Sequence, residues 1–252
     1  MQRYIAIKVL VLLIAGFATR AESRPERTWQ ISLETGVQTE YADRGATVGG
    51  DHIKTALGVS DGRLSVGVSY TRMLAHNRLV YDDEIDINLD YGLKTGSGIH
   101  LNLGADLIHN PVHGSLLDLG AHKASTIETY VSVGFEELLN PQFTAYFDIH
   151  LHDFVLEMAL APSYPLSGRS SLDVKLMAGG AFLHSEQDNL YISAGLGYHY
   201  ALSDKLNIHL SVNSGLSSQK TFTDTAWNHS GEVSVHNDHK SFWAGIGISR
   251  DF

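Results

Sequence analysis

Acidic side chains alternate with apolar ones along several short stretches of this 252-residue sequence. In one stretch Asp86, Asn88 and Asp90 alternate with Ile87 and Leu89. Successive side chains of an extended strand point to opposite faces, so these carboxylates share one face. Carboxylates that line a narrow, poorly solvated space attract cations and repel anions. The candidates for such a charged wall are Glu34, Glu40, Lys54, Asp86, Asp90, Asp106, Glu128, Asp148, Glu157, Asp173 and Lys175.

Histidines are the second group of residues that could take part in catalysis or bind a metal. His150, His152 and Asp153 lie close together in the sequence, and general acid–base catalysis uses such residues. However, the strand histidines fall on polar faces, without a serine and a histidine together on an apolar face, and the sequence has no Gly-x-Ser-x-Gly nucleophile elbow. A polar segment near the C-terminus holds further potential metal ligands, but their spacing matches no hairpin or helix metal site. These are His229, His236, Asp238 and His239. We expect no catalytic residue, no metal site and no cofactor.

The composition excludes several classes of protein. The chain has no cysteine, which rules out disulfide scaffolds, thiolate metal sites and cysteine nucleophiles. Its formal charge is −10, which argues against nucleic-acid binding by neutralisation of phosphates. The mean hydropathy of −0.07 is compatible with a membrane barrel, because apolar and polar residues alternate along its strands.

An alternation with a period of two runs through most of the chain. Trp29, Ile31 and Leu33 share one face of the first stretch, whereas Gln30 and Ser32 lie on the other. The same pattern, broken by turn residues, predicts twelve strands. Their expected ranges are residues 29–41, 53–59, 64–70, 85–91, 99–107, 127–135, 143–151, 154–160, 172–182, 190–198, 206–212 and 242–252.

The connections between these strands alternate in length. Short turns such as Asp61-Gly62 follow every second strand, whereas most of the remaining connections are long. An even number of strands would leave both termini of a barrel on one side of the membrane. Aromatic residues are expected near both ends of the apolar strand faces, where a bilayer favours them. The sequence therefore predicts an all-β fold: one transmembrane antiparallel up-and-down β-barrel of about 12 strands, with its apolar face toward lipid.

The last stretch ends on Phe252. It resembles the closing strand of bacterial outer-membrane β-barrels, whose C-terminal aromatic residue is an assembly signal. Arg250 departs from that pattern, which has an aromatic or apolar residue at this position. The resemblance implies that Phe252 is the assembly signal and that the barrel assembly machinery and outer-membrane lipid are partners.

The first residues differ in kind from the rest. Arg3 supplies a positive charge, residues 5–17 are largely apolar, and Ala18 and Ala21 are small. This order is typical of a secretory signal peptide, and the apolar run is too short to span a membrane. We expect a signal peptide at residues 1–21 and a single barrel domain at residues 22–252.

One segment carries a resemblance to a known family. Residues Glu40-Tyr41-Ala42-Asp43-Arg44-Gly45 are similar to the Tyr-x-x-Arg-Gly signature that closes the first strand in the TorF family of porin-like outer-membrane barrels. Residues 84–91 and 128–135 resemble later strands of that family. The resemblance implies a small barrel in the outer membrane of a Gram-negative bacterium.

The charged wall and this resemblance together suggest a function. We expect a porin-like channel for passive diffusion of ions or small hydrophilic solutes, with a preference for cations. Glycines on the polar face, including Gly36, Gly67 and Gly104, are expected to leave room for an open lumen. The alternatives are a non-conducting structural or adhesive barrel, because side chains often fill small barrels, and a less favoured outer-membrane hydrolase.

Overall fold

The computed structural model describes residues 29–74, 80–95, 98–120, 123–184, 187–227 and 233–252. The predicted signal peptide, residues 1–21, lies outside the described residues. Among the described residues, no helix is long and apolar enough to cross a membrane.

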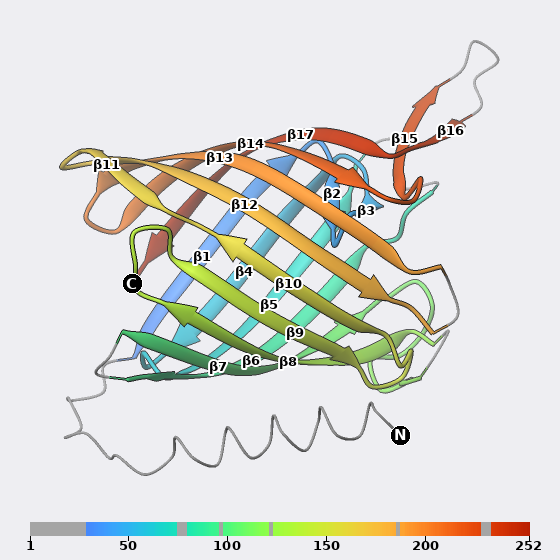
Figure 1. Ribbon diagram of the computed structural model, residues 1–252, viewed down its shortest axis with the longest axis horizontal. Helices are drawn as coiled ribbons and strands as arrows, with labels where there is room; N and C mark the ends of the chain where they lie inside the picture. The colour runs from blue at the N-terminus through green and yellow to red at the C-terminus, as the bar shows by residue number, and fades with distance from the viewer. Residues whose placement is uncertain (1–28, 75–79, 96–97, 121–122, 185–186, 228–232) are drawn as a thin grey trace.

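Twelve long antiparallel strands form a closed barrel (Figure 1). Each strand pairs with its neighbours in chain order, the first strand pairs with the last, and β10 pairs with both β9 and β12. The predicted barrel and its strand number are confirmed, with ends that differ by a few residues. The strands are β1 (Gln30–Gln38), β4 (His52–Ser60), β5 (Leu64–Met73), β6 (Glu84–Lys94), β7 (Ile99–His109), β8 (Ser125–Phe135), β9 (Pro141–Asp148), β10 (Phe154–Leu160), β12 (Ser170–Phe182), β13 (Asn189–Ser203), β14 (Leu206–Ser217) and β17 (Lys240–Asp251).

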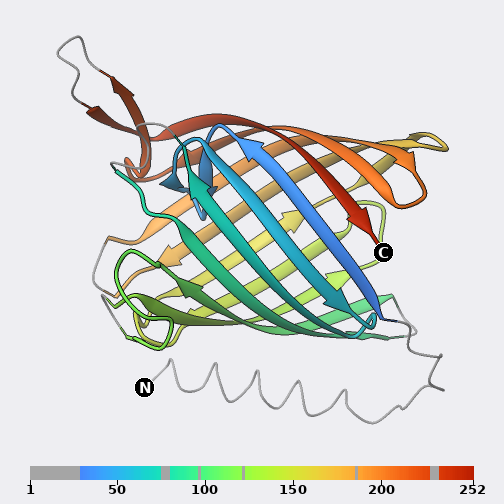
Figure 2. The ribbon, with the colours of Figure 1, turned by 180° about the vertical axis from the view of Figure 1, so that it is seen from behind.

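Five further short strands complete the described secondary structure. The strand β11 (Ser163–Ser167) continues the direction of β10 along β12. The strands β15 (Phe222–Trp227) and β16 (Val233–Asp238) pair with each other and project beyond the barrel wall (Figures 1 and 2). The strands β2 (Tyr41–Asp43) and β3 (Ala46–Gly49) form a small hairpin between β1 and β4.

The closing pair β1–β17 removes the two free edges of the sheet. Thr35 lies opposite Ile248, and the pairing extends from Gln38 to Ser32 along β1. Beyond β17, the amide of Phe252 donates a hydrogen bond to the carbonyl of Ile31 at 3.0 Å. Closure satisfies the strand backbones within the wall, as a hydrocarbon environment demands.

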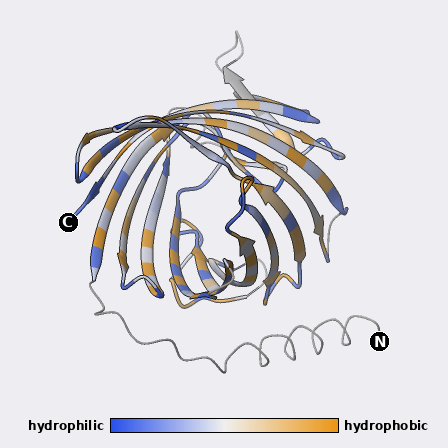
Figure 3. Ribbon diagram, turned by 60° about the vertical axis from the view of Figure 1, so that its left-hand side comes forward, coloured by the Kyte–Doolittle hydropathy of each residue, from blue (hydrophilic) through white to orange (hydrophobic). Residues whose placement is uncertain are grey.

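The two faces of the wall have the opposite polarity to those of a water-soluble protein: apolar side chains are exposed and polar side chains are buried. Apolar residues such as Leu57 and Leu89 are 45% and 50% exposed, whereas the polar Thr71 and Ser132 are buried. Apolar and polar residues alternate along the strands (Figure 3). Hydrogen bonds from the polar face reach groups inside the ring, as described below, so the apolar face is the outer one.

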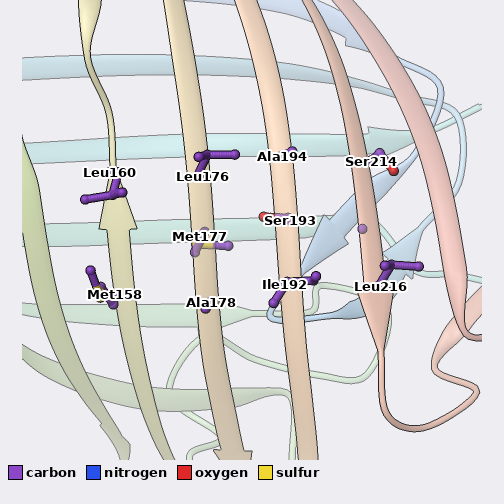
Figure 4. Close-up of a pocket in the computed structure, with 11 residues that line it drawn as sticks. Met158, Leu160, Leu176, Met177, Ala178, Ile192, Ser193, Ala194, Ser214 and Leu216 are labelled. Atoms are coloured by element: carbon purple, nitrogen blue, oxygen red, sulfur yellow. The ribbon is translucent and has the colours of Figure 1, made fainter. Parts of the chain in front are cut away.

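A shallow apolar groove lies on the wall at β10, β12, β13 and β14 (Figure 4). Small side chains at Ala178, Ala194 and Ser214 lie there among larger ones such as Leu176 and Ile192. The exposed Leu176 and Ile192 belong to the outer apolar face, which identifies the groove as a hollow in the lipid-facing wall.

The hairpin β2–β3 corrects the predicted first strand and its loop. The sequence predicts a first strand that extends to Tyr41. Instead β1 ends at Gln38, and the chain turns through Arg44 and Gly45, whose φ angles are 48° and 76°. Positive φ at both central residues is the geometry of a tight two-residue hairpin. Tyr41 therefore leaves the outer face, and its hydroxyl donates to Glu84 at 2.9 Å.

The reversed faces lead to a first prediction. Replacement Leu57→Arg puts a charge on the lipid-facing side near the middle of β4 and should lower the free energy of unfolding in a bilayer by about 2–4 kcal/mol. Replacement Ala56→Arg, one residue away, puts the same side chain on the inner face opposite Glu34 and should cost much less. Equilibrium folding into lipid vesicles measures both values. Equal losses would contradict the assignment of the faces.

Candidate functional site in the barrel lumen

The hairpin β2–β3 lies inside the barrel, at the end opposite the C-terminus (Figures 1 and 2). The amide of Thr47 donates to the carbonyl of Thr221 at 3.0 Å, and the amide of Thr223 donates to the Thr47 hydroxyl at 2.9 Å. The carbonyl of Gly45 accepts hydrogen bonds from the Thr221 hydroxyl and from Asn189 Nδ2. The segment after β14 and the start of β13 therefore hold one side of the hairpin.

Arg44, at the turn of the hairpin, reaches the opposite wall. Its Nη1 and Nη2 each donate to one oxygen of Glu128 on β8, both at 2.5 Å. Its guanidinium carbon lies 4.2 Å from the centre of the Tyr146 ring on β9. Because β8 is five strands away from β1 around a ring of twelve, this contact crosses the lumen. Glu128 must therefore point inward, which fixes the polar face as the inner one.

The charge of Arg44 is secured by its surroundings. Burial acts to lower its pKa, but the nearby carboxylates of Asp43 and Glu128 outweigh burial, and the pKa is raised above its ordinary value. Asp43 Oδ2 lies 3.6 Å from Arg44 Nε. The guanidinium is thus a permanent cation inside the lumen, beside Glu128.

Tyr41 anchors the base of the hairpin on the neighbouring wall. In addition to the bond to Glu84, the Lys54 ammonium lies 5.4 Å from the centre of the Tyr41 ring. Lys54 also pairs with Asp86 at 3.5 Å. Burial, followed by the charges of Glu84 and Asp43, raises the pKa of Tyr41, so its phenol stays protonated and donates.

Tyr191 fills the space beside the hairpin turn. Its hydroxyl donates to Glu157 on β10 at 2.6 Å, and only 3% of the residue is exposed. A Cβ atom at Gly45 or at Gly179 would overlap the Tyr191 side chain. The hairpin turn thus packs closely against Tyr191 at Gly45, and we call this contact the seat of the turn.

The predicted wall residues divide into three groups. Six surround the hairpin or face it from the β5–β8 wall: Glu40, Lys54, Asp86, Asp106, Glu128 and Glu157. Four lie along other parts of the wall, where Asp173 is 2.8 Å from His199 and Glu34 is 3.5 Å from His209: Glu34, Asp90, Asp173 and Lys175. Asp148 is buried at the end of β9 and accepts from Thr126 and from the amides of His150 and Leu151, so it stabilises a turn.

The inner glycines leave less room than expected. The Tyr130 ring lies against Gly104, the Asn88 side chain against Gly67, and the backbone of Ile246 against Gly36. At Gly67 and Gly104 a neighbouring side chain occupies the site of a Cβ, whereas at Gly36 the backbone of the paired strand does so. The expectation that the inner glycines widen the lumen was therefore wrong for Gly67 and Gly104, which accommodate inward side chains.

Arg44 is the residue that sequence reasoning missed. It belongs to the Tyr-x-x-Arg-Gly segment but is absent from the predicted charged wall, whose cations are Lys54 and Lys175. The available signal was the Arg-Gly pair itself, because glycine favours the positive φ that a tight turn requires.

The residues considered for catalysis do not form a catalytic arrangement. His150 Nδ1 accepts a hydrogen bond from the backbone amide of Ile127 at 3.3 Å. The His152 ring packs against His184 at 5.9 Å, while Asp153 accepts from the His184 amide. Within the described ranges, no group of three His, Asp or Glu residues is arranged to hold a metal ion. His229 lies outside the described residues.

Comparison with known proteins supports the fold. No protein-family model and no curated protein matches the sequence. The structure is similar to the NanC porin, with a TM-score of 0.53 and 9% sequence identity over 87% of this chain and 98% of that one. It is also similar to the KdgM porin solved in complex with disordered oligogalacturonate, with a TM-score of 0.52 and 10% identity over 88% and 99%. The chain therefore has the fold of a bacterial outer-membrane β-barrel.

The close seat of the hairpin turn leads to a second prediction. Replacement Gly45→Ala adds a methyl group that overlaps Tyr191 at a positive φ, and it should displace the turn from the lumen. Gly62→Ala is a matched control, because φ is 83° there but nothing lies within 4 Å of the added Cβ. Since the chain lacks cysteine, a single Ala46→Cys reporter can be labelled with a maleimide in the folded barrel.

We expect Gly45→Ala to accelerate the labelling several-fold and Gly62→Ala to leave it unchanged. Equal rates in the two variants would show that the seat at Tyr191 does not hold the hairpin.

Proposed function

We propose that the chain is an outer-membrane channel for passive diffusion of small hydrophilic solutes, narrowed by the hairpin β2–β3 and selective for cations. The observation that carries the proposal is a polar interior into which the tethered hairpin β2–β3 reaches, joining both sides of the wall through Arg44 and Thr47. Two structurally similar proteins are porins, which supports a channel, although at 9–10% identity the similarity itself concerns the fold. The Tyr-x-x-Arg-Gly segment that resembles the TorF family is the part of the chain that forms this hairpin.

The preference for cations rests on the imbalance of charge around the lumen. Asp86 and Glu128 have cationic partners in Lys54 and Arg44. Asp106 lies opposite Glu128 in the β7–β8 register, and Asp90 accepts a hydrogen bond from the Ser65 hydroxyl at 3.4 Å. An interior with surplus carboxylates lowers the energy of a cation and raises that of an anion. An anionic saccharide such as oligogalacturonate would therefore be a poor solute here.

A barrel closed to ions is the second candidate. The hairpin and the inward rings at Tyr130 and Tyr191 support it, because they occupy space that an open pore needs. Planar-bilayer recording of the folded chain separates the two candidates. A heat-modifiable, folded barrel that gives no current above background would leave the non-conducting barrel as the function.

Charge removal within the lumen gives a third prediction. The double replacement Asp90→Asn and Asp106→Asn should move the cation-to-anion permeability ratio toward one, because neither carboxylate pairs with a cation among the residues that the structure describes. Asp204→Asn, in the turn between β13 and β14, removes a charge outside the lumen and serves as the control. Reversal potentials in a salt gradient measure the ratio. An unchanged potential in the double variant would refute the acidic-wall explanation.

The terminal residue gives a fourth prediction. We propose that Phe252 is the signal read by the barrel assembly machinery, and its deletion should reduce assembly more than Arg250→Tyr does. In the structure the Arg250 guanidinium carbon lies 4.8 Å from the centre of the Phe252 ring, so Arg250 covers the signal residue without replacing it. The heat-modifiable fraction in outer-membrane preparations measures assembly. Equal assembly of the two variants would argue against this signal.

A further inference from the structure

We infer that Glu128 and Tyr146 form a binding site for organic cations of the guanidinium class, which Arg44 occupies as a tethered ligand until a solute displaces it. This inference rests on the proposed channel and names the class of solute that its narrow part recognises. It differs from general cation preference, because surplus charge alone does not distinguish guanidinium from potassium.

The contacts of Arg44 are those that a free guanidinium ion would make. Both terminal nitrogens donate to separate oxygens of Glu128, and the planar group lies 4.2 Å from the centre of the Tyr146 ring. A bidentate pair with a carboxylate and a stacking contact with an aromatic face are the two interactions by which proteins select guanidinium over a spherical ion. The site therefore has a shape and not only a charge.

The wall half of the site, Glu128 and Tyr146, is held more rigidly than the half that Arg44 contributes. Glu128 and Tyr146 lie on adjacent paired strands of the barrel wall, and the register places Tyr130 opposite Tyr146 and Asp148 opposite Glu128. The Glu128 side chain is 5% exposed, whereas that of Arg44 is 23% exposed. The wall half is thus enclosed and fixed, while the arginine half approaches it from the lumen on a two-residue turn.

The hairpin does not depend on Arg44 alone. Thr47 is hydrogen-bonded to Thr221 and Thr223, and Tyr41 is hydrogen-bonded to Glu84. Release of the Arg44 side chain therefore leaves the base of the hairpin attached. Release without a replacement would leave the enclosed Glu128 carboxylate without a cationic partner, which costs free energy. A solute that brings its own guanidinium removes that cost, so exchange of one cation for another is the favoured route.

Neighbouring groups would support a bound solute. Asp106 lies opposite Glu128 in the β7–β8 register, and the ring centres of Tyr130 and Tyr146 are 5.6 Å apart. A second carboxylate and a second ring beside the site suit a solute whose cationic group is attached to a short organic body.

The test uses potassium current through the folded barrel, with methylguanidinium as the probe. Removal of the tethered ligand in Arg44→Ala should make the site available, so methylguanidinium should reduce the current at a concentration about tenfold or more below that needed for the wild type. The double variant Arg44→Ala with Glu128→Gln should lose that sensitivity. Tetramethylammonium, which has no N–H donor for the Glu128 oxygens, should distinguish Arg44→Ala from the double variant much less than methylguanidinium does.

Equal sensitivity of Arg44→Ala and the double variant would overturn the inference, and so would equal sensitivity of Arg44→Ala and the wild type. Either result would mean that Arg44 only stabilises the hairpin inside the barrel and does not occupy a ligand-binding site. Calorimetric titration of methylguanidinium into the same folded variants in detergent provides a readout without conduction. If the wild type carries no current, the channel proposal fails, but binding to Arg44→Ala that is lost in the double variant still establishes the site, and its absence rejects it.

Discussion

Backbone hydrogen bonding is the constraint from which the rest of this structure follows. A lipid hydrocarbon offers no partner for an unpaired N–H or C=O group, so a sheet can cross it only as a closed ring. The pairings of β1 with β17 and of β10 with β12 close this ring. Once the ring is closed, the alternation of side chains along each strand assigns every second residue to lipid and the others to the interior. The polar interior is therefore a consequence of closure.

The polar interior creates the second problem that the structure solves. Carboxylates such as Glu128 and Glu157 need cations or hydrogen-bond donors, because a buried charge without a partner is unfavourable. The hairpin β2–β3 supplies Arg44 to Glu128, and β13 supplies Tyr191 to Glu157. Both solutions place bulky groups inside the barrel. The groups that provide partners for these carboxylates are thus the same groups that occupy space in the lumen.

The two regions of the lumen differ in the strength of their charge pairs. Around the hairpin, Glu128 is nearly enclosed and holds its arginine in two hydrogen bonds. Nearer the termini, Asp173 pairs with His199 where the side chains are 39% and 47% exposed, and such exposed pairs contribute little. The charge pair at the hairpin is therefore held more firmly than the exposed pair near the termini.

The sequence by itself determined the barrel. Strict alternation between turn residues specified the strands to within a few residues, because period two is a local property of the chain and closure requires an even, fully paired set. The same alternation puts Glu128 and Glu157 on the polar faces of their strands, where they contact Arg44 and Tyr191. The path of residues 41–49 was decided only by the tertiary structure. The contacts that hold this hairpin in the lumen join Arg44 to Glu128, 84 positions away, and Thr47 to Thr223, 176 positions away. No local pattern records partners at such separations, so the sequence alone could not place residues 41–49 inside the barrel.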